Sequence, residues 1–130
     1  MYEQTTRNVV VRVEPDFLAD QSSPADDRYI WAYTVEIENK GSEDLQVMER
    51  FWRIADRDGQ VQEVRGDGVV GEKPVLKPGE TFRYTSGAPL SAPSGIMLGT
   101  YQVENKQGER FDVDIPAFSL DSPFDHRTIN

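Results

Sequence analysis

Hydrophobic and polar residues alternate with a period of two along most of the chain, and the 3.6-residue period of an amphipathic helix is almost absent. The clearest alternation runs over residues 29–38, where apolar side chains share one face: Tyr29, Trp31, Tyr33, Val35 and Ile37. A shorter alternation runs from Val9 to Val13 and is expected to end at Pro15, which lacks the N–H that a strand uses. Both segments predict strands with one buried face.

Turn residues divide the rest of the chain into further short strands. Hairpin turns are predicted at 56–59 and 105–108, and Pro78 and Gly79 favour a type II turn. Between the turns, the pattern predicts strands over 45–55, 60–65, 81–86, 96–104 and 109–115. About seven or eight short strands predict an all-β, antiparallel two-sheet β-sandwich of the immunoglobulin or fibronectin type III kind, with a closed barrel as the alternative.

The predicted strand over 45–55 is unusual because both of its faces mix apolar and charged side chains. Arg50 and Trp52 lie two residues apart, so they are expected on the same face. Since Trp and Arg dominate binding hot spots, the pair is a candidate interaction face. The favoured interpretation is that Trp52 belongs to the core, as a Trp on a central strand of an immunoglobulin-like sandwich does.

The chain has 130 residues, so we expect a single domain over 1–130, with a core at about 9–124 and short flexible termini. The absence of cysteine excludes disulfides, thiolate metal sites and a cysteine nucleophile. Without a signal peptide or a membrane-spanning apolar run, a cytoplasmic location is expected. The net charge of −9, from 23 acidic and 14 basic residues, disfavours nucleic acid and anionic membranes as direct partners.

The hexapeptide Gly66-Asp67-Gly68-Val69-Val70-Gly71 has the glycine spacing by which dinucleotide-binding loops seat a pyrophosphate. Those loops lead into a helix that supplies N–H donors, whereas Pro74 and Pro78 forbid a helix here. One interpretation is an anion cradle with Arg65 and Lys73 on either side. The favoured one is that the glycines permit positive φ or close packing, while Val69 and Val70 plug the core or a shallow surface groove. A separate hypothesis is that the two valines form a contact tip for a partner.

Evidence for metal binding or catalysis is weak. The segments Asp26-Asp27 and Asp56-Arg57-Asp58-Gly59 carry paired carboxylates, but turn formation explains both, and the second lacks the further oxygen ligands of a calcium loop. The single histidine, His126, lies close to the C-terminus, which excludes a His-dependent triad or zinc cluster. We therefore predict no catalytic residue, no metal site and no cofactor.

Short motifs spread from about Val9 to Phe124 match the signature of a known family. They are Tyr33-Thr34-Val35, Arg50-Phe51-Trp52-Arg53-Ile54, the segment 66–74, Leu76-Lys77-Pro78-Gly79-Glu80, Tyr84-Thr85-Ser86-Gly87, Gly95-Ile96-Met97, Gly99-Thr100-Tyr101 and Ile115-Pro116-Ala117-Phe118. In this combination the chain resembles the ApaG family. The resemblance implies a fibronectin type III-like sandwich in a small cytoplasmic protein, with no established catalytic residues. It also implies a protein-interaction role, as for similar modules in F-box and polymerase-delta-interacting proteins, and a link to cobalt and magnesium efflux.

The sequence therefore predicts a non-enzymatic module that binds another protein through a sheet face and the loop 66–71. Two alternatives stay open, namely phosphate or nucleotide binding through that loop and a role in divalent cation homeostasis. An edge strand that pairs with a second copy of the chain would give a homodimer.

Overall fold

The computed structural model describes residues 1–125, which contain nine strands and two short 3-10 helices. The strands are β1 (Tyr2–Thr6), β2 (Val9–Phe17), β3 (Tyr29–Asn39), β4 (Leu45–Asp56), β5 (Val61–Asp67), β6 (Val75–Leu76), β7 (Thr81–Leu90), β8 (Gly95–Asn105) and β9 (Arg110–Leu120). The helices η1 (Ala19–Gln21) and η2 (Pro24–Asp26) lie between β2 and β3. His126, considered above as a catalytic candidate, falls outside the described residues.

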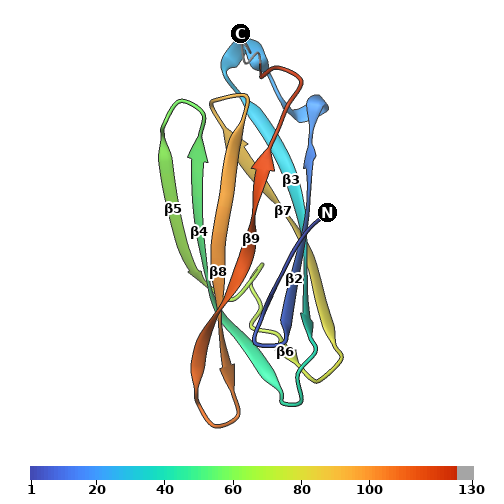
Figure 1. Cartoon of the computed structure of the whole chain (residues 1–130). Helices are drawn as coiled ribbons and strands as arrows, with labels where there is room; N and C mark the ends of the chain where they lie inside the picture. The colour runs from blue at the N-terminus through green and yellow to red at the C-terminus, as the bar shows by residue number, and fades with distance from the viewer. Residues whose placement is uncertain (126–130) are drawn as a thin grey trace.

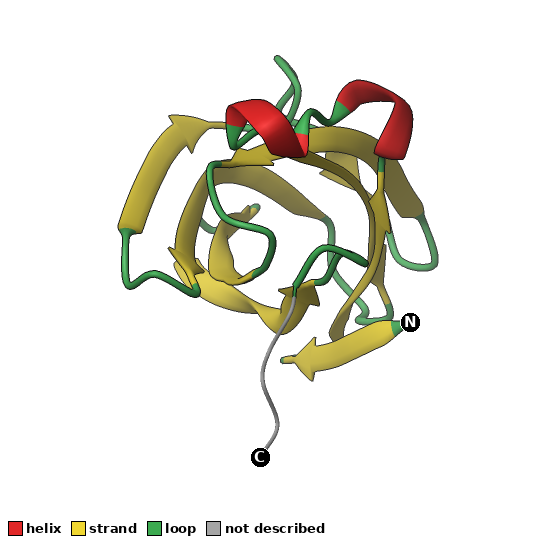
Figure 2. Cartoon of the chain, turned by 90° about the horizontal axis from the view of Figure 1, so that it is seen from above, coloured by secondary structure: helices red, strands yellow, loops and turns green. Residues whose placement is uncertain are grey.

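The strands pair antiparallel in two sheets (Figure 1). One sheet has the strand order β1-β2-β3-β7, and the other has the order β5-β4-β8-β9, with β6 paired to the start of β4. Figure 2 shows the sheets curving around a shared interior, with the helical turns across one end. The predicted all-β, two-sheet antiparallel sandwich is confirmed.

The core lies between the two sheets and consists of alternate residues from each strand. On β3, the inward face predicted from the alternation is buried throughout, from Tyr29 to Ile37. The facing sheet contributes Trp52, whose ring centroid lies 5.3 Å from that of Tyr33 and 6.0 Å from that of Phe118. The edge-to-face contact with Tyr33 joins the two sheets, and the contact with Phe118, on β9 of the same sheet, helps to fix Trp52 in the centre of the sandwich.

A β-bulge in β4 explains why both faces of this strand looked mixed in the sequence. Val47 pairs with Val103 of β8, but Glu49 already pairs with Gln102, so Met48 has no partner in the ladder. Because the extra residue reverses the alternation, Leu45 and Val47 point inward before the bulge, and Trp52 and Ile54 point inward after it. The simple two-residue alternation expected for a strand over 45–55 therefore holds only on either side of the bulge.

The sequence missed two strands and ended three others too early, since β7 continues to Leu90 and β9 to Leu120. β1 was treated as a flexible terminus, but it pairs with β2 from Tyr2↔Val13 to Thr6↔Val9. The two-residue strand β6 was not predicted. β2 continues past Pro15 to Phe17. On the side that faces β1, β2 has no paired residue beyond Val13, so the missing N–H of Pro15 leaves no hydrogen bond unmade there.

Within residues 1–125, no helix has the length and apolar character needed to cross a bilayer.

Candidate binding surface at the glycine loop

The loop after β5 is a tight hairpin turn. The N–H of Val69 donates to the carbonyl of Glu72 at 2.8 Å, and the N–H of Glu72 donates back to Val69 at 2.9 Å. Between them, Val70 and Gly71 both have positive φ, 42° and 80°. Two central residues with positive φ define the type I′ turn, whose twist suits antiparallel strands. The N–H of Gly68 donates to the carbonyl of Met48 at 2.8 Å, which ties the turn to the bulge in β4.

At two of the glycines other atoms occupy the space of a side chain, and at Gly68 that obstacle is backbone. A Cβ on Gly68 would lie 2.0 Å from the carbonyl oxygen of Glu72, and Gly68 also has a φ of 60°. A Cβ on Gly66 would lie 2.7 Å from the guanidinium atoms of Arg50. The glycines thus permit close packing and positive φ, which is the interpretation that the sequence favoured.

The two valines of the loop have opposite surroundings. Val69 is fully buried and belongs to the core, whereas the side chain of Val70 is 53% exposed at the tip of the turn. Val70 is also strained, because its φ of 42° lies in the left-handed region, where a β-branched residue is a rare outlier. The loop therefore both anchors itself in the core and presents one apolar side chain to solvent.

Arg50 is a cation that bonds to the backbone of the loop. Its Nη1 donates to the carbonyl oxygens of Asp67 at 3.0 Å and Gly68 at 3.1 Å, so the guanidinium satisfies backbone acceptors where β5 ends. The sequence placed Arg65 and Lys73 beside the loop as anion contacts. Arg65 lies on the outer face of the sheet, with its guanidinium 4.4 Å from the ring centroid of Phe51. Lys73 does lie beside the loop, since a Cβ on Gly68 would be 3.1 Å from its Cγ.

Arg50 also faces three buried tyrosines in the seam between the sheets. The hydroxyls of Tyr84 on β7 and Tyr101 on β8 are hydrogen-bonded to each other, and Tyr33 on β3 lies close enough to interact electrostatically with both. Burial raises the pKa of all three hydroxyls above the ordinary value for tyrosine, and the positive charge of Arg50 partly opposes this rise. The tyrosines therefore stay neutral and link the two sheets.

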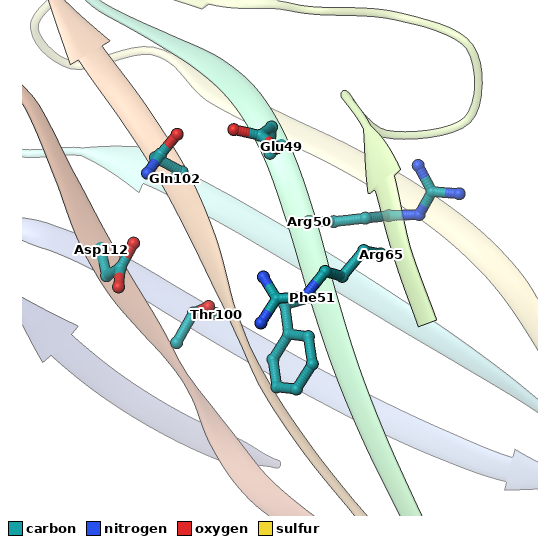
Figure 3. Close-up of a pocket in the computed structure, with 7 residues that line it drawn as sticks. All are labelled: Glu49, Arg50, Phe51, Arg65, Thr100, Gln102 and Asp112. Atoms are coloured by element: carbon teal, nitrogen blue, oxygen red, sulfur yellow. The ribbon is translucent and has the colours of Figure 1, made fainter. Parts of the chain in front are cut away.

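The outer face of the sheet β5-β4-β8-β9 is hollowed beside this region. A hollow of about 330 Å³ is lined by Glu49, Arg50, Phe51, Arg65, Thr100, Gln102 and Asp112 (Figure 3). Arg50 runs toward β5 and away from Asp112 and Thr100 in this view. Since the hollow mixes two carboxylates with Arg65, it has no single charge preference for a small ligand.

The outer face is apolar near the opposite end of β5. Val61 on β5 and Ile96 on β8 flank Ala55 in the ladder, and Leu98 lies opposite Arg53 in the next inter-strand row. Their side chains are exposed, Val61 by 48%, Ile96 by 50% and Leu98 by 40%. The sequence contained the signal for this patch, because the alternation that places Met97 inside also places Ile96 and Leu98 outside.

The proposed pairing of Arg50 and Trp52 in one interaction face does not occur. Trp52 is only 3% exposed and belongs to the core, as the favoured interpretation predicted. Arg50 is half-buried and engaged with the loop. The pair therefore supports the fold rather than forming an exposed face.

The carboxylates considered for metal binding are occupied by turns. Asp56 Oδ1 accepts hydrogen bonds from the backbone N–H groups of Asp58 at 2.9 Å and Gln60 at 3.0 Å. Asp26 accepts one from the hydroxyl of Ser23 at 2.8 Å. Among residues 1–125, no three histidine or carboxylate side chains gather in a way that could hold a metal ion.

Comparisons with known proteins agree on one family. A family model described as the ApaG domain matches residues 19–105. The chain is 58% identical over 130 residues to Protein ApaG of Parvibaculum lavamentivorans and 57% identical over 130 residues to that of Paramagnetospirillum magneticum, with both proteins covered completely. It is also 46% identical to the crystal structure of a putative ApaA protein from Bordetella pertussis, with a TM-score of 0.86 over 95% of this chain and 99% of that one.

Proposed function

The chain belongs to the ApaG family, and from this premise we propose that it is a non-enzymatic module that binds another protein through the loop 66–71. The observation that carries the proposal is the conformation of Val70, which is exposed at the loop tip and strained. Left-handed backbone costs about 1–2 kcal/mol for a residue other than glycine, and type I′ turns favour Asn, Asp or Gly at this position. An apolar residue that is unfavourable for folding and exposed to water is explained if a partner contacts it.

The surroundings of Val70 indicate what kind of surface would accept it. The exposed side chains of Asp67 and Glu72 flank the turn, and the whole chain carries a net charge of −9. A partner that offers a small apolar pocket with a basic rim would complement this tip in both shape and charge. The apolar patch of Val61, Ile96 and Leu98 on the sheet face supplies a second area that the same partner can cover.

Three further parts of the proposal concern the kind of fold, the location and catalysis. A fibronectin type III-like classification is supported by the strand order, in which β2-β3-β7 corresponds to strands A-B-E and β5-β4-β8-β9 to C′-C-F-G, with a buried Trp on strand C. A cytoplasmic location is supported by the absence of cysteine. Among the described residues, the perturbed tyrosines lie inside the seam rather than in a cleft open to substrate, which supports a role without catalysis.

The two alternative functions have less support. An anion cradle at residues 66–71 would need successive N–H groups that converge on one point, but those of Gly68 and Val69, in the middle of the loop, are bonded to the carbonyls of Met48 and Glu72. Isothermal titration with millimolar ATP is therefore expected to give no heat above dilution. A role in divalent cation homeostasis would have to act through a partner, because the candidate carboxylates hold turns. Magnesium or cobalt is therefore expected to leave the melting temperature unchanged.

A matched pair of substitutions tests the proposed function. Val70 and Val75 are equally exposed, at 53% and 52%, but only Val70 lies on the loop. Partners are first captured from the native cell with the unmodified chain and located by crosslinking mass spectrometry, and the binding of the purified partner is then measured. Val70→Asn is expected to weaken binding by about tenfold or more, and Val75→Asn to leave it unchanged. A partner that binds both variants as tightly as the original chain would remove the loop from the interface.

A further inference from the structure

β5 is a sheet edge that is neither covered nor interrupted by proline. The sheets end at β1, β7, β5 and β9. β1 and β9 lie against each other, since the N–H of Asp114 donates to Thr6 Oγ1 at 3.2 Å and that of Ser119 donates to the Tyr2 hydroxyl at 3.3 Å. β7 is also an edge strand, and Pro89 near its end removes one N–H donor from it. β5 contains no proline, all of its residues except Gly66 are exposed, and no strand lies beyond it (Figure 1).

The hydrogen-bonding pattern of β4 and β5 shows which backbone groups of β5 face the free edge. The N–H of Asp56 donates to Gln60 at 2.9 Å, and the N–H of Gly68 donates to Met48 at 2.8 Å, on either side of the ladder. Because bonding alternates along an antiparallel strand, even-numbered residues of β5 bond to β4. The odd-numbered residues, such as Glu63 and Arg65, therefore point their N–H and C=O groups outward.

The side chains of β5 are complementary to a second copy of the same strand. If two copies pair antiparallel about Val64, Glu63 of each copy lies opposite Arg65 of the other, and both residues belong to the set with free backbone groups. A two-fold centre at Glu63 would set two glutamates opposite each other, and a centre at Arg65 would set Glu63 opposite Asp67. Opposite charges directly across a ladder are favourable and like charges are unfavourable. A centre at Gly66 would also set Arg65 opposite Asp67, but it would place Glu63 opposite Val69, beyond the end of β5. The centre at Val64 therefore combines opposite charges with pairing along the whole strand.

Beyond the proposed function, we infer that the chain forms a two-fold symmetric dimer by antiparallel pairing of β5 with β5, centred on Val64. The sheet β5-β4-β8-β9 of each copy then joins that of the other to form one continuous sheet. The exposed Val64 side chains of the two copies meet. Because only a seven-residue strand is paired, the interface is small and the dimer is weak and dependent on concentration. Since the loop 66–71 follows β5 in each copy, the two Val70 tips lie at opposite ends of the paired strands.

A single cysteine tests this register, since the chain has none of its own. Val64→Cys places the two sulfurs across a non-hydrogen-bonded pair, where the Cα atoms lie about 4.5 Å apart, within the range of a disulfide. Val61→Cys is the control on the same strand, with similar exposure, because the two copies of residue 61 lie about 20 Å apart in the dimer. Mild oxidation is expected to link Val64→Cys into dimers at least tenfold faster than Val61→Cys. Equal rates would overturn the proposal.

Charge exchange on the strand gives an independent test by sedimentation velocity over a range of concentrations. Glu63→Arg and Arg65→Glu each create like-charge pairs across the two-fold axis, and each is expected to weaken dimerisation at least tenfold. The double variant recreates both opposite pairs and is expected to restore the dissociation constant to within about threefold, although the contacts of Glu63 with Arg53 and of Arg65 with Phe51 stay lost. Failure of the double variant to recover, or a monomer at millimolar concentration, would show that β5 does not pair with itself.

Discussion

At the scale of single residues, Gly68 and Gly71 distinguish the two reasons for a glycine in the loop. Both have positive φ, but a Cβ on Gly71 would meet no atom within 4 Å, whereas one on Gly68 would meet Glu72 at 2.0 Å. Gly71→Ala is therefore expected to lower the free energy of unfolding by about 1–2 kcal/mol from backbone strain alone. Gly68→Ala should lower it by about 4 kcal/mol or more, because strain and a backbone collision add. Urea unfolding of the two variants measures the difference, and equal losses would contradict the described turn.

Val70 carries a prediction of the opposite sign. Val70→Asn gives the turn an Asn-Gly pair, which suits type I′ geometry, and asparagine tolerates left-handed backbone better than valine. We expect the free energy of unfolding to rise by about 1 kcal/mol, measured by urea unfolding with Val75→Asn as the control. If Val70→Asn folds more stably and still loses partner binding, the loss cannot result from unfolding. A destabilised variant would show that Val70 is retained for the fold.

Arg50 marks the limit of what sequence can show about the loop. Its contact with the loop depends on the pairing of β4 with β5, which sets Arg50 opposite Gly66. Sequence indicated that the loop glycines permit close packing, but the atoms that approach Gly66 and Gly68 come from residues 50 and 72. Proximity in sequence therefore indicated Arg65 and Lys73, whereas strand pairing brings Arg50 to the loop from a distance of 16 residues.

At the scale of elements, the tyrosine pair links β7 of one sheet to β8 of the other and makes stability dependent on pH. Burial raises the pKa of Tyr84 and Tyr101 above the unfolded value of about 10. The unfolded chain therefore releases these protons first, so the stabilisation is complete below about pH 10 and is lost as the pH rises further. Urea midpoints from pH 8 to 11 should fall less steeply for the double variant Tyr84→Phe, Tyr101→Phe. The same slope in both proteins would contradict a buried neutral pair.

Strands were predictable from sequence where burial alone determines their pattern. β3 alternates without interruption because one face packs on the core along its whole length. β4 could not be interpreted in this way, because the bulge at Met48 changes which residues point inward, and nothing in the local sequence marks that position. The only apolar residue in β1 is Tyr2, so hydrogen bonding to β2 defines this strand more than burial does.

At the scale of the whole molecule, β1 closes one side of the sandwich by lying between the edges of β2 and β9. Tyr2 packs against Phe118 with ring centroids 6.0 Å apart, and its hydroxyl accepts the N–H of Ser119. Removing residues 1–7 would expose both edges, so we expect a loss of several kcal/mol in the free energy of unfolding and a tendency to aggregate. Urea unfolding and light scattering measure the two effects. Tyr2→Phe keeps the ring and loses only the hydroxyl, so it should lower the free energy of unfolding by about 1 kcal/mol without aggregation. A truncated chain as stable and monomeric as the full one would return β1 to the flexible terminus that its sequence suggested.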